Sequence, residues 1–564
     1  MKKRWVINTP PEATKIEELS KKLNCHPVIA NLLLQRGITS SEQAQSFFYP
    51  SLNMLHDPFL MKDMDKAVER LDRAIAQDEK ILIYGDYDVD GTTAVSLLYK
   101  YLKHHCNSDN LEYYIPDRYT EGYGVSIKGI DYAAENGFSL MLITDCGIKA
   151  VEKVKYANSR QVDIIICDHH TPGDTLPEAI AVLDPQRPDC PYPYKWLSGC
   201  GVSFKLVQAH SLKHNLPMSE LYKLLDLLCV SIASDIVPIT GENRILAYFG
   251  LQQLNSNPSL GLKTIIKISG IDKEITINDI VFRIGPRINA AGRVESGRKS
   301  VELLTADEKC SAADQRKKLD HDITEEAIRH INQSELEPSK KTTVLFNANW
   351  HKGVIGIVAS RLTESFYRPT IILTESNGLA TGSARSVEGF DLYYAISQCS
   401  EFLENYGGHK YAAGLTLKIE NIEPFKQKFE RIVRETIDDE MLTPQINIDA
   451  KIKLTDITPD LYHMLQKFAP FGPNNTIPVF MTEKVTNFIG TKRVGRNNEH
   501  LKLVIVDDTR ACNDRSGIGF GMGHLYDKVN SGGFFDICYT LQENEFMGKN
   551  DIQMIVKDIR LREE

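Results

Sequence analysis

The sequence predicts an α/β protein in which two α/β domains, joined by a long helix, are followed by a C-terminal β-barrel. Between residues 81 and 184, short apolar runs alternate with amphipathic ones, as strands and helices do around a parallel sheet. A second pattern of this kind begins at TTVLFNANW (342–350). From about residue 445 the chain changes to short strands and turns, which is typical of a small barrel.

Length and composition indicate several domains and a reducing environment. The 564 residues are too many for one hydrophobic core. The net charge of −9 argues against a coat of positive charge, but not against a local basic groove. No apolar run approaches the roughly 20 residues that span a bilayer. Eleven scattered cysteines without a CxxC pair favour reduced thiols in the cytoplasm over structural zinc or disulfides.

Five segments follow from these patterns. Residues 15–49 read as two or three short helices, and the charged stretch from about 300 to 337 reads as one solvated helix. We therefore expect an N-terminal helical segment, a first α/β domain, a connecting helix, a second α/β domain and a barrel. Their expected bounds are 1–65, 66–298, 299–338, 339–442 and 443–564.

The stretch DYDVDG (86–91) follows an apolar strand and resembles the first half of a calcium loop. A calcium loop needs a glutamate at position twelve, where this chain has Leu97, and a helix before it. We reject that interpretation and keep a polar turn that caps a helix as the simple alternative. In an extended segment, Asp86, Asp88 and Asp90 would point to one side, and such clustered carboxylates require protonation or a cation.

Other potential metal ligands follow the next strands. Asp145 follows SLMLIT, Asp168 and the His169–His170 pair follow VDIIIC, and Asp235 lies near the end of a helix. Each alone is a common cap or turn residue. Together, several strand ends that carry carboxylates and imidazoles are typical of a two-metal site. Mixed oxygen and imidazole ligands favour manganese or magnesium, and histidine favours manganese.

These residues stand in four ordered motifs, DYDVDG, DCG, DHH and SDIVP, which resemble those of the DHH phosphoesterase superfamily. Within it, the sequence is similar to the RecJ family. The similarity also rests on PDRYTEGYG (116–124), GPRINAAGR (285–293), HKGVIGIVASRL (351–362), GSARSVEGFDL (382–392), GGHKYAAG (407–414) and PFGPNNTIPVF (470–480). It covers residues 60 to 564 and implies a DHH domain, a DHH-associated domain and an OB-fold domain.

The resemblance implies a role for each residue of the four motifs. Asp145 would bridge two metals, Asp168 would orient the neighbouring histidine, and His170 would contact the scissile phosphate. Asp86 would be either a ligand or a support for its neighbours. The implied metal ligands are Asp88, Asp90, Asp145, His169 and Asp235, and the further catalytic residues are His170, Asp168 and Asp86.

The resemblance also implies contacts with a nucleic acid. A 5′-terminal phosphate would be held by Arg118, Ser383 and Arg385. Other contacts with the substrate would come from Arg287, Asn289, Arg293, Gly407, Gly408 and His409. In the barrel, the basic and aromatic side chains available to a single strand are Lys484, Phe488, Lys492, Arg493, Arg496 and His500. Simpler alternatives are solvated arginines, an ordinary exposed hairpin, a tight turn at GGHKYAAG and a left-handed helix cap at Gly292.

The implied function is a single-stranded-DNA-specific 5′-to-3′ exonuclease that uses two Mn²⁺ or Mg²⁺ ions and releases 5′-mononucleotides in DNA repair and recombination. The resemblance further implies a cytoplasmic monomer, without a membrane, that works with single-strand-binding protein and a RecQ-type helicase. A short-oligonucleotide or cyclic-dinucleotide phosphodiesterase is one alternative, which GPRINAAGR and the barrel disfavour. A non-catalytic single-strand-binding scaffold is another, which the intact acids disfavour.

Overall fold

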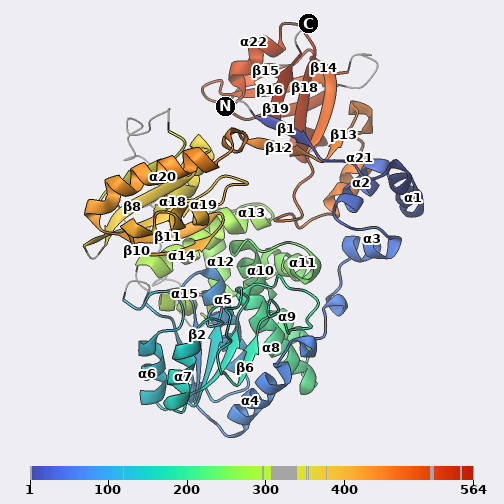
Figure 1. The fold of residues 1–564 in the computed structure, drawn as a ribbon. Helices are drawn as coiled ribbons and strands as arrows, with labels where there is room; N and C mark the ends of the chain where they lie inside the picture. Colours follow the sequence, from blue (N-terminus) through green and yellow to red (C-terminus); the bar gives the residue numbers. More distant parts are fainter. Residues whose placement is uncertain are drawn as a thin grey trace. The chain divides into compact units, whose positions relative to one another are not determined.

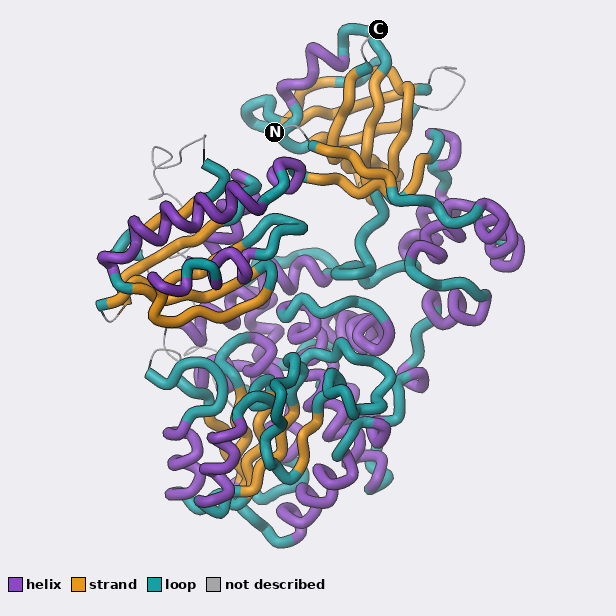
Figure 2. The backbone as a smooth tube through the Cα atoms, viewed as in Figure 1, coloured by secondary structure: helices purple, strands orange, loops and turns teal. Residues whose placement is uncertain are grey.

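A computed structural model describes residues 3–562 apart from 118–119, 295–296, 307–339, 351, 353–354, 377, 508–513 and 547–548. The chain forms two compact units, of which the first joins Met1–Asn8 to Leu319–Ile448 and the second joins Thr9–Lys318 to Asp449–Glu564 (Figures 1 and 2). The expected connecting helix lies outside the described residues from position 307 onward. Within the described ranges, no helix combines the length and the apolar character that a membrane span requires.

A five-stranded parallel sheet forms the centre of the second unit, in the order β3-β2-β4-β5-β6. The predicted strands are confirmed as β2 (Ile81–Gly85), β3 (Leu111–Tyr114), β4 (Leu140–Thr144), β5 (Asp163–Cys167) and β6 (Ala181–Leu183). Their apolar runs are buried on both faces, as in most parallel sheets. The strand order reverses between β2 and β4, and open parallel sheets bind ligands beyond the carboxyl ends of strands at such a point.

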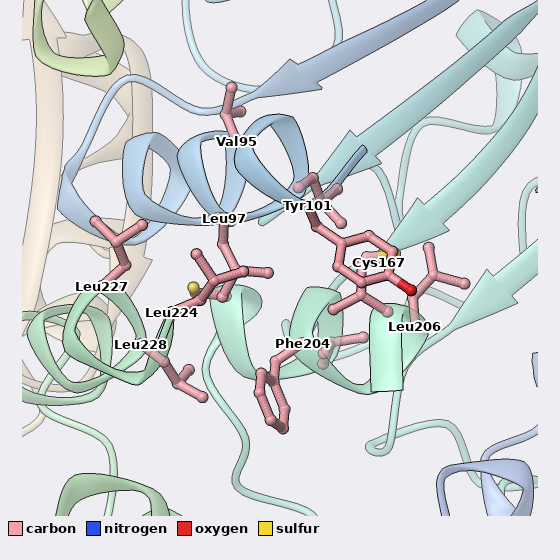
Figure 3. Close-up of a cluster of buried hydrophobic side chains, with 14 of the residues drawn as sticks. Val95, Leu97, Tyr101, Cys167, Phe204, Leu206, Leu224, Leu227 and Leu228 are labelled. Carbon is pink, nitrogen blue, oxygen red and sulfur yellow. The ribbon is translucent and has the colours of Figure 1, made fainter. Parts of the chain in front are cut away.

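Helices cover both faces of this sheet. One face packs against α4 (Met64–Ala76), α5 (Val89–Leu102) and α8 (Gly199–Lys213), and the other against α6 (Ile127–Glu135) and α7 (Val151–Ser159). Figure 3 shows the first layer, where Leu97 and Tyr101 of α5 lie near Phe204 of α8 and near Leu227, which belongs to the helix that follows at 225–234. The remaining helices are α9 (Met218–Tyr222), α10 (Leu225–Ser234), α11 (Gly241–Ser256), α12 (Leu260–Ile268), α13 (Ile277–Asp279), a π-helix (Ile280–Ile284), α14 (Gly285–Val294) and α15 (Gly297–Leu304).

The same unit contains the predicted barrel, closed by the pairing of β14 with β16. Its core includes Phe468 and Phe535, and it also takes in Leu33 from the N-terminal helices. The strands are β13 (Ala450–Lys451), β14 (Phe480–Asn487), β15 (Lys492–Val494), β16 (His500–Val506), β17 (Arg515–Gly519), β18 (Phe535–Phe546) and β19 (Lys549–Leu561). The helices around them are α1 (Ala13–Leu23), α2 (Pro27–Gln35), α3 (Ser41–Phe48), α21 (Pro459–Gln466) and α22 (Tyr526–Val529).

The first unit contains a mixed sheet in the order β10-β11-β9-β8-β7. Its elements are β7 (Thr343–Phe346), α18 (Ile355–Phe366), β8 (Thr370–Ser376), β9 (Leu379–Arg385), α19 (Leu392–Ser397), β10 (Leu403–His409), β11 (Ala412–Leu417) and α20 (Ile422–Thr436). One expected barrel strand, INIDAKI, is divided. Its first half, β12 (Gln445–Ile448), pairs instead with β1 (Arg4–Ile7), and the first unit ends at Ile448.

Gly250 permits the close packing of α11 against α10, the helix that leads to Asp235. A Cβ atom at this position would lie 2.4 Å from the Leu225 carbonyl oxygen and 2.5 Å from Cys229 Cβ. We expect Gly250→Ala to lower the free energy of unfolding by about 1–3 kcal/mol, since backbone cannot move aside easily. Denaturant unfolding followed by circular dichroism measures this. Gly533→Ala is the control, because nothing lies within 4 Å of its added Cβ, and equal loss in both variants would contradict the expectation.

Candidate metal centre

The DYDVDG stretch leaves β2 and begins α5 directly. Asp88 is the N-cap of α5, where its Oδ1 accepts a hydrogen bond from the Gly91 backbone N–H at 3.0 Å, and Asp90 lies in the first turn. The expected extended alternation is therefore wrong, because carboxylates satisfy the free N–H groups at the start of a helix. Asp88 does cap a helix, as the simple alternative predicted, and the acidic side chains do cluster. The carboxylates converge because the chain turns into a helix at the end of the strand.

Asp90 is buried and anchors the start of α8. Its two oxygens accept hydrogen bonds from the backbone N–H groups of Gly199 at 2.7 Å and Cys200 at 2.9 Å, and from Ser231 Oγ at 2.7 Å. Because helix N-termini carry partial positive charge, they stabilise an ionised carboxylate at this position. A Cβ atom on Gly199 would lie 2.6 Å from Asp145 Oδ1, so only glycine lets α8 begin this close to the end of β4.

His169, at the end of β5, faces three carboxylates. Its Nε2 lies 3.2 Å from Asp145 Oδ1, 3.7 Å from Asp90 Oδ2 and 3.6 Å from Asp235 Oδ2. This nitrogen is buried and has no hydrogen-bond partner among the described residues. Asp235 is the C-cap of α10, where the helix dipole is negative and disfavours a second negative charge. The three carboxylates therefore surround His169 Nε2 without forming a hydrogen bond to it.

The electrostatics of this cluster call for a cation. Burial and the neighbouring Asp90 and Asp88 carboxylates hold the pKa of Asp145 and of Asp235 well above the usual range of aspartate. Burial also lowers the pKa of His169, so its ring is a neutral ligand at pH 7. A bound divalent cation would offset the repulsion and favour the ionised carboxylates.

The donor atoms fit two such cations. Within 4.8 Å of one another lie donors of Asp86, Asp88 and Asp145 in one group, and donors of Asp90, His169 and Asp235 in a second group. Asp145 stands between the groups, since its Oδ1 is 3.2 Å from His169 Nε2. Neighbouring ligands of an octahedral ion with bonds near 2.1 Å lie roughly 3 Å apart, which is close to the distances found here.

Asp168 holds the ring of His170, not that of His169. Asp168 Oδ1 lies 2.7 Å from His170 Nδ1, while Oδ2 accepts from the Ile148 backbone N–H at 2.8 Å. Burial alone would raise the pKa of Asp168, but the bond from His170 lowers it to about 2. Burial would likewise lower the pKa of His170, but Asp168 raises it to about 9. The pair is therefore a carboxylate and an imidazolium at neutral pH.

Tyr123 is a neighbour of this pair that sequence reasoning missed. Its Oη lies 3.2 Å from His170 Nε2, and its ring meets that of Tyr87 edge to face with centroids 6.4 Å apart. The available signal was its place in the stretch PDRYTEGYG, of which only the arginine was singled out. That arginine, Arg118, lies outside the described residues.

The GPRINAAGR segment forms α14. Arg287 is half-buried and its Nη1 donates to the Arg283 carbonyl at 2.5 Å, and Asn289 is also half-buried on this helix. The side chain of Arg293 lies outside the described part of the chain. The alternative of a helix cap at Gly292 is wrong, because α14 continues to Val294. Helix α14 contacts α5, and a Cβ atom on its first residue, Gly285, would lie 2.8 Å from Ser234 Oγ, one residue before Asp235.

In the first unit, the structure brings Ser383 and Arg385 together on one face of β9. Arg385 Nη1 donates to Ser383 Oγ at 3.1 Å and to the Ala384 carbonyl at 2.8 Å. Gly356, near the start of α18, lies beside both: a Cβ there would be 3.2 Å from Ser383 Oγ and 3.4 Å from Arg385 Nη2. A helix N-terminus beside a guanidinium suits a phosphate group. Sequence reasoning missed Gly356, whose signal was a glycine at the start of a predicted helix.

The GGH stretch ends β10 on the same sheet. In the pairing register, His409 is opposite Ala412 of β11, and Ala412 is opposite Arg385 of β9. His409 and Arg385 are thus two strand spacings apart, or roughly 10 Å at the backbone. Gly407 is exposed, and Gly408 has a φ of 147° and no room for a Cβ, which would meet the Ala412 oxygen at 2.4 Å.

The barrel carries basic and aromatic side chains in two settings. Lys492 lies directly opposite Lys502 in the β15–β16 pair, and like charges in such positions repel unless an anion is present. Arg493 instead pairs with Asp527 at 2.6 Å, which fits the simple hairpin interpretation. Phe488 is exposed, as are Lys484 and Arg496.

A further exposed aromatic, Phe520, meets the His500 ring with centroids 5.2 Å apart. Sequence reasoning missed Phe520 and Lys502 because strand register decides which side chains are neighbours.

Family comparisons agree with this arrangement. The DHH family N-terminal domain matches residues 80–232, the DHHA1 domain matches 339–435, and the RecJ OB domain matches 448–558. The single-stranded-DNA-specific exonuclease RecJ of Bacillus subtilis (strain 168) is 36% identical over all of this chain and 71% of its own length. The chain belongs to the RecJ family.

Other RecJ relatives extend the match. The exonuclease of Salmonella typhimurium is 30% identical over 97% of this chain and 98% of its own. The crystal structure of RecJ in complex with Mn²⁺ from Thermus thermophilus has a TM-score of 0.82 at 25% identity, covering 100% of this chain and 80% of that one. An exonuclease RecJ bound to manganese is 30% identical over 69% of this chain, with a TM-score of 0.57. The expected family and fold class are confirmed.

The Asp168–His170 pair predicts a pH dependence in the RecJ-family chain freed of metal by a chelator. Replacing Asp168 by Asn removes the partner that raises the pKa of His170, while burial remains. We expect the pKa of His170 to fall below about 9, while Asp235 and Asp90, which also raise it, remain. Histidine NMR titration measures this, with the exposed His104 as an unchanged reference. An unaltered His170 titration would contradict the assigned pair.

The same pair sets a window of stability. A group whose pKa is raised by folding stabilises the folded state fully when the pH is below its ordinary pKa. This stabilisation is lost as the pH rises through the pKa of the folded state. For His170 the loss runs from 6.5 to about 9. For Asp168, whose pKa is lowered, the contribution is present above 3.8 and is lost as pH falls towards about 2. The stabilisation is therefore greatest between these two ranges.

Proposed function

We propose that this chain is a single-stranded-DNA-specific exonuclease that hydrolyses phosphodiester bonds from the 5′ end with two divalent cations, Mn²⁺ or Mg²⁺. It would release 5′-mononucleotides in DNA repair and recombination. The observation that carries the proposal is the convergence of five aspartates and His169 from separate elements into one cluster. The names of RecJ relatives, and their structures in complex with Mn²⁺ and Mg²⁺, support it.

Each cation would have its own ligands. Asp86 and Asp88 would hold the first, His169 and Asp235 the second, and Asp145 would lie between them. This assigns Asp86 as a direct ligand. Asp90 would be a further ligand of the second cation, and it also accepts a hydrogen bond from the backbone N–H at the start of α8. Two bound cations would activate water as the nucleophile and neutralise charge on the attacked phosphate and the leaving oxygen. The imidazole ligand favours manganese.

His170 would bind the scissile phosphate. The bond from Nδ1 to Asp168 keeps the ring charged at neutral pH and fixes its orientation. Its Nε2 is then a donor that can reach an anionic oxygen. Tyr123, which contacts this nitrogen, would position the ring from the other side. No serine or cysteine nucleophile is needed in this scheme.

Polarity would come from recognition of a terminal phosphate. Ser383, Arg385 and the start of α18 at Gly356 form a small polar site, which Arg118 would complete on the family resemblance. Only a strand end presents a terminal phosphate, so this site would select ends over internal positions. His409, with Gly407 and Gly408 beside it, would contact another phosphate of the substrate, because exposed glycines let backbone N–H groups approach closely.

Further contacts would extend the binding surface for the single-stranded DNA beyond the site of hydrolysis. Arg287, Asn289 and Arg293 of α14 would contact the backbone of the substrate. On the barrel, Lys492 and Lys502 would bind phosphates, and the exposed Phe488 and Phe520 would stack on bases. Lys484 and Arg496 add positive charge, and binding should weaken with added salt.

We also place the enzyme in the cytoplasm as a monomer that acts with single-strand-binding protein and a RecQ-type helicase. Cysteines of the described ranges such as Cys146, Cys167 and Cys200 are free thiols, which suits a reducing compartment.

One assay separates this proposal from a small-substrate phosphodiesterase and from a binding scaffold. The purified chain with Mn²⁺ is given end-labelled single-stranded DNA, duplex DNA, dinucleotides and pyrophosphate. Progressive loss of the single strand from its 5′ end is expected. Cleavage of the dinucleotide alone would favour the small-substrate enzyme, and binding without cleavage would favour the scaffold.

Asp145→Asn should abolish hydrolysis, with a loss of at least about 100-fold in kcat, because it weakens both cation positions. Single-stranded DNA binding should persist, since the barrel contacts are untouched. Gel-based nuclease assays and fluorescence anisotropy measure the two effects. Asp131→Asn is the matched control, because Asp131 pairs with Arg160 on the outer helices. Wild-type activity of Asp145→Asn would refute the metal assignment.

Arg385→Met should lower kcat/KM on 5′-phosphorylated single strands by about 10- to 100-fold, which is the size expected for losing a charged hydrogen bond to phosphate. The loss should be much smaller on strands with a 5′-hydroxyl. Steady-state kinetics on the two substrates measure it, with Arg434→Met of α20 as the control. Equal losses on both substrates would show that Arg385 does not recognise the terminal phosphate.

A further inference from the structure

A second group of side chains that could hold a metal lies where α4 packs against the end of α8, the helix that begins at the carboxylate cluster. It comprises Asp72 of α4 with His210 and His214 at the end of α8, whose donor atoms lie within 4.8 Å of one another. His210 is eleven residues beyond Gly199, so it lies about 16 Å along the helix from the carboxylate cluster. None of these residues takes part in the function proposed above.

The distances suit a small tetrahedral ion. His210 Nε2 lies 3.4 Å from Asp72 Oδ1, and His214 Nε2 lies 2.8 Å from the same oxygen. Ligands of a tetrahedral ion with bonds of 2.0–2.1 Å are roughly 3.3 Å apart. The first distance already fits, and the second needs a small turn of His214, whose side chain is 44% exposed. Histidines four residues apart lie on the same face of a helix, so the helix holds two ligands side by side before an ion binds.

The ring of His210 is held as metal-binding histidines are held. Tyr101 Oη, at the end of α5, lies 2.7 Å from His210 Nδ1 and 2.8 Å from Ser211 Oγ. When Nδ1 donates to Tyr101, the lone pair of Nε2 points towards Asp72, and such outer contacts orient ligands in metal sites.

An ordinary ion-pair network is the alternative for this group. Lys213 Nζ lies 2.8 Å from Asp72 Oδ2, so one positive charge already neighbours the carboxylate. Lys213 uses the other oxygen, however, and leaves Oδ1 to the two imidazoles. Its side chain is 44% exposed and can turn towards water. The end of α8 also carries partial negative charge, which favours a cation there.

We propose that Asp72, His210 and His214 bind one transition-metal cation of the zinc class, with water as the fourth ligand, at a site separate from the catalytic pair. Two imidazoles and one carboxylate are a zinc-type donor set and are poor ligands for magnesium. The ion would join α4 to α8, and so stabilise the helical layer against which the parallel sheet packs.

Cobalt provides the test, because tetrahedral Co²⁺ absorbs visible light far more strongly than octahedral Co²⁺. The full-length chain, stripped of metal by a chelator, is titrated with Co²⁺ alone. We expect a saturable tetrahedral spectrum in the wild type that added Zn²⁺ abolishes. His214→Ala and Asp72→Asn should weaken Co²⁺ binding at this site at least about 10-fold. Lys213→Met should strengthen it, because a like charge is removed.

Two controls isolate the site. His104→Ala alters an exposed histidine outside the group and should leave the spectrum unchanged. His214→Ala should retain Mn²⁺-dependent nuclease activity, which shows that it is folded, while it binds one zinc fewer per chain by elemental analysis. A wild type without the tetrahedral spectrum, or a His214→Ala variant with an unchanged spectrum and zinc content, would overturn the proposal.

Discussion

Mutual repulsion between carboxylates is the constraint on which the catalytic half of this protein depends. Asp86, Asp90 and Asp145 are buried within one small volume where little water screens their charges. The surrounding backbone is arranged to tolerate them. The start of α8 donates two N–H groups to Asp90, and the chain after β4 donates one to Asp168. The remaining unbalanced charge is what a pair of divalent cations would neutralise.

The strand order decides where this charge can be concentrated. Because β2 and β4 are neighbours and the helices that follow them, α5 and α7, pack on opposite faces of the sheet, the carboxyl ends of these strands form a switch point of the kind where open parallel sheets bind ligands. Helices α5 and α8 begin near this edge of the sheet, and at their other ends Tyr101 meets His210. The same two helices therefore connect the carboxylate cluster to the proposed second metal site. Carboxylates lie at the helix N-termini and the proposed cation at the C-terminal end of α8, as the helix dipole favours.

Much of the fold and of the candidate site followed from sequence. The strands of the parallel sheet were predictable because buried apolar runs with helical intervals leave few alternatives. The expected extended alternation of Asp86, Asp88 and Asp90 was wrong, because helix capping governs this turn. The partners of Asp168 and the contacts of Tyr123 and Gly356 could not be predicted. They depend on which strand ends and helix starts become neighbours, which no local pattern encodes.

The sequence by itself determined the family, the order of the domains and the residues that carry the metal chemistry, because these reside in ordered motifs of specific residue types. Only the tertiary structure decided how those residues meet. It placed Asp168 on His170, set Asp145 between two donor groups, and divided INIDAKI between two units. It also brought Asp72 to His210 and His214, which follow more than a hundred residues later in the chain, because helix packing alone makes α4 and α8 neighbours.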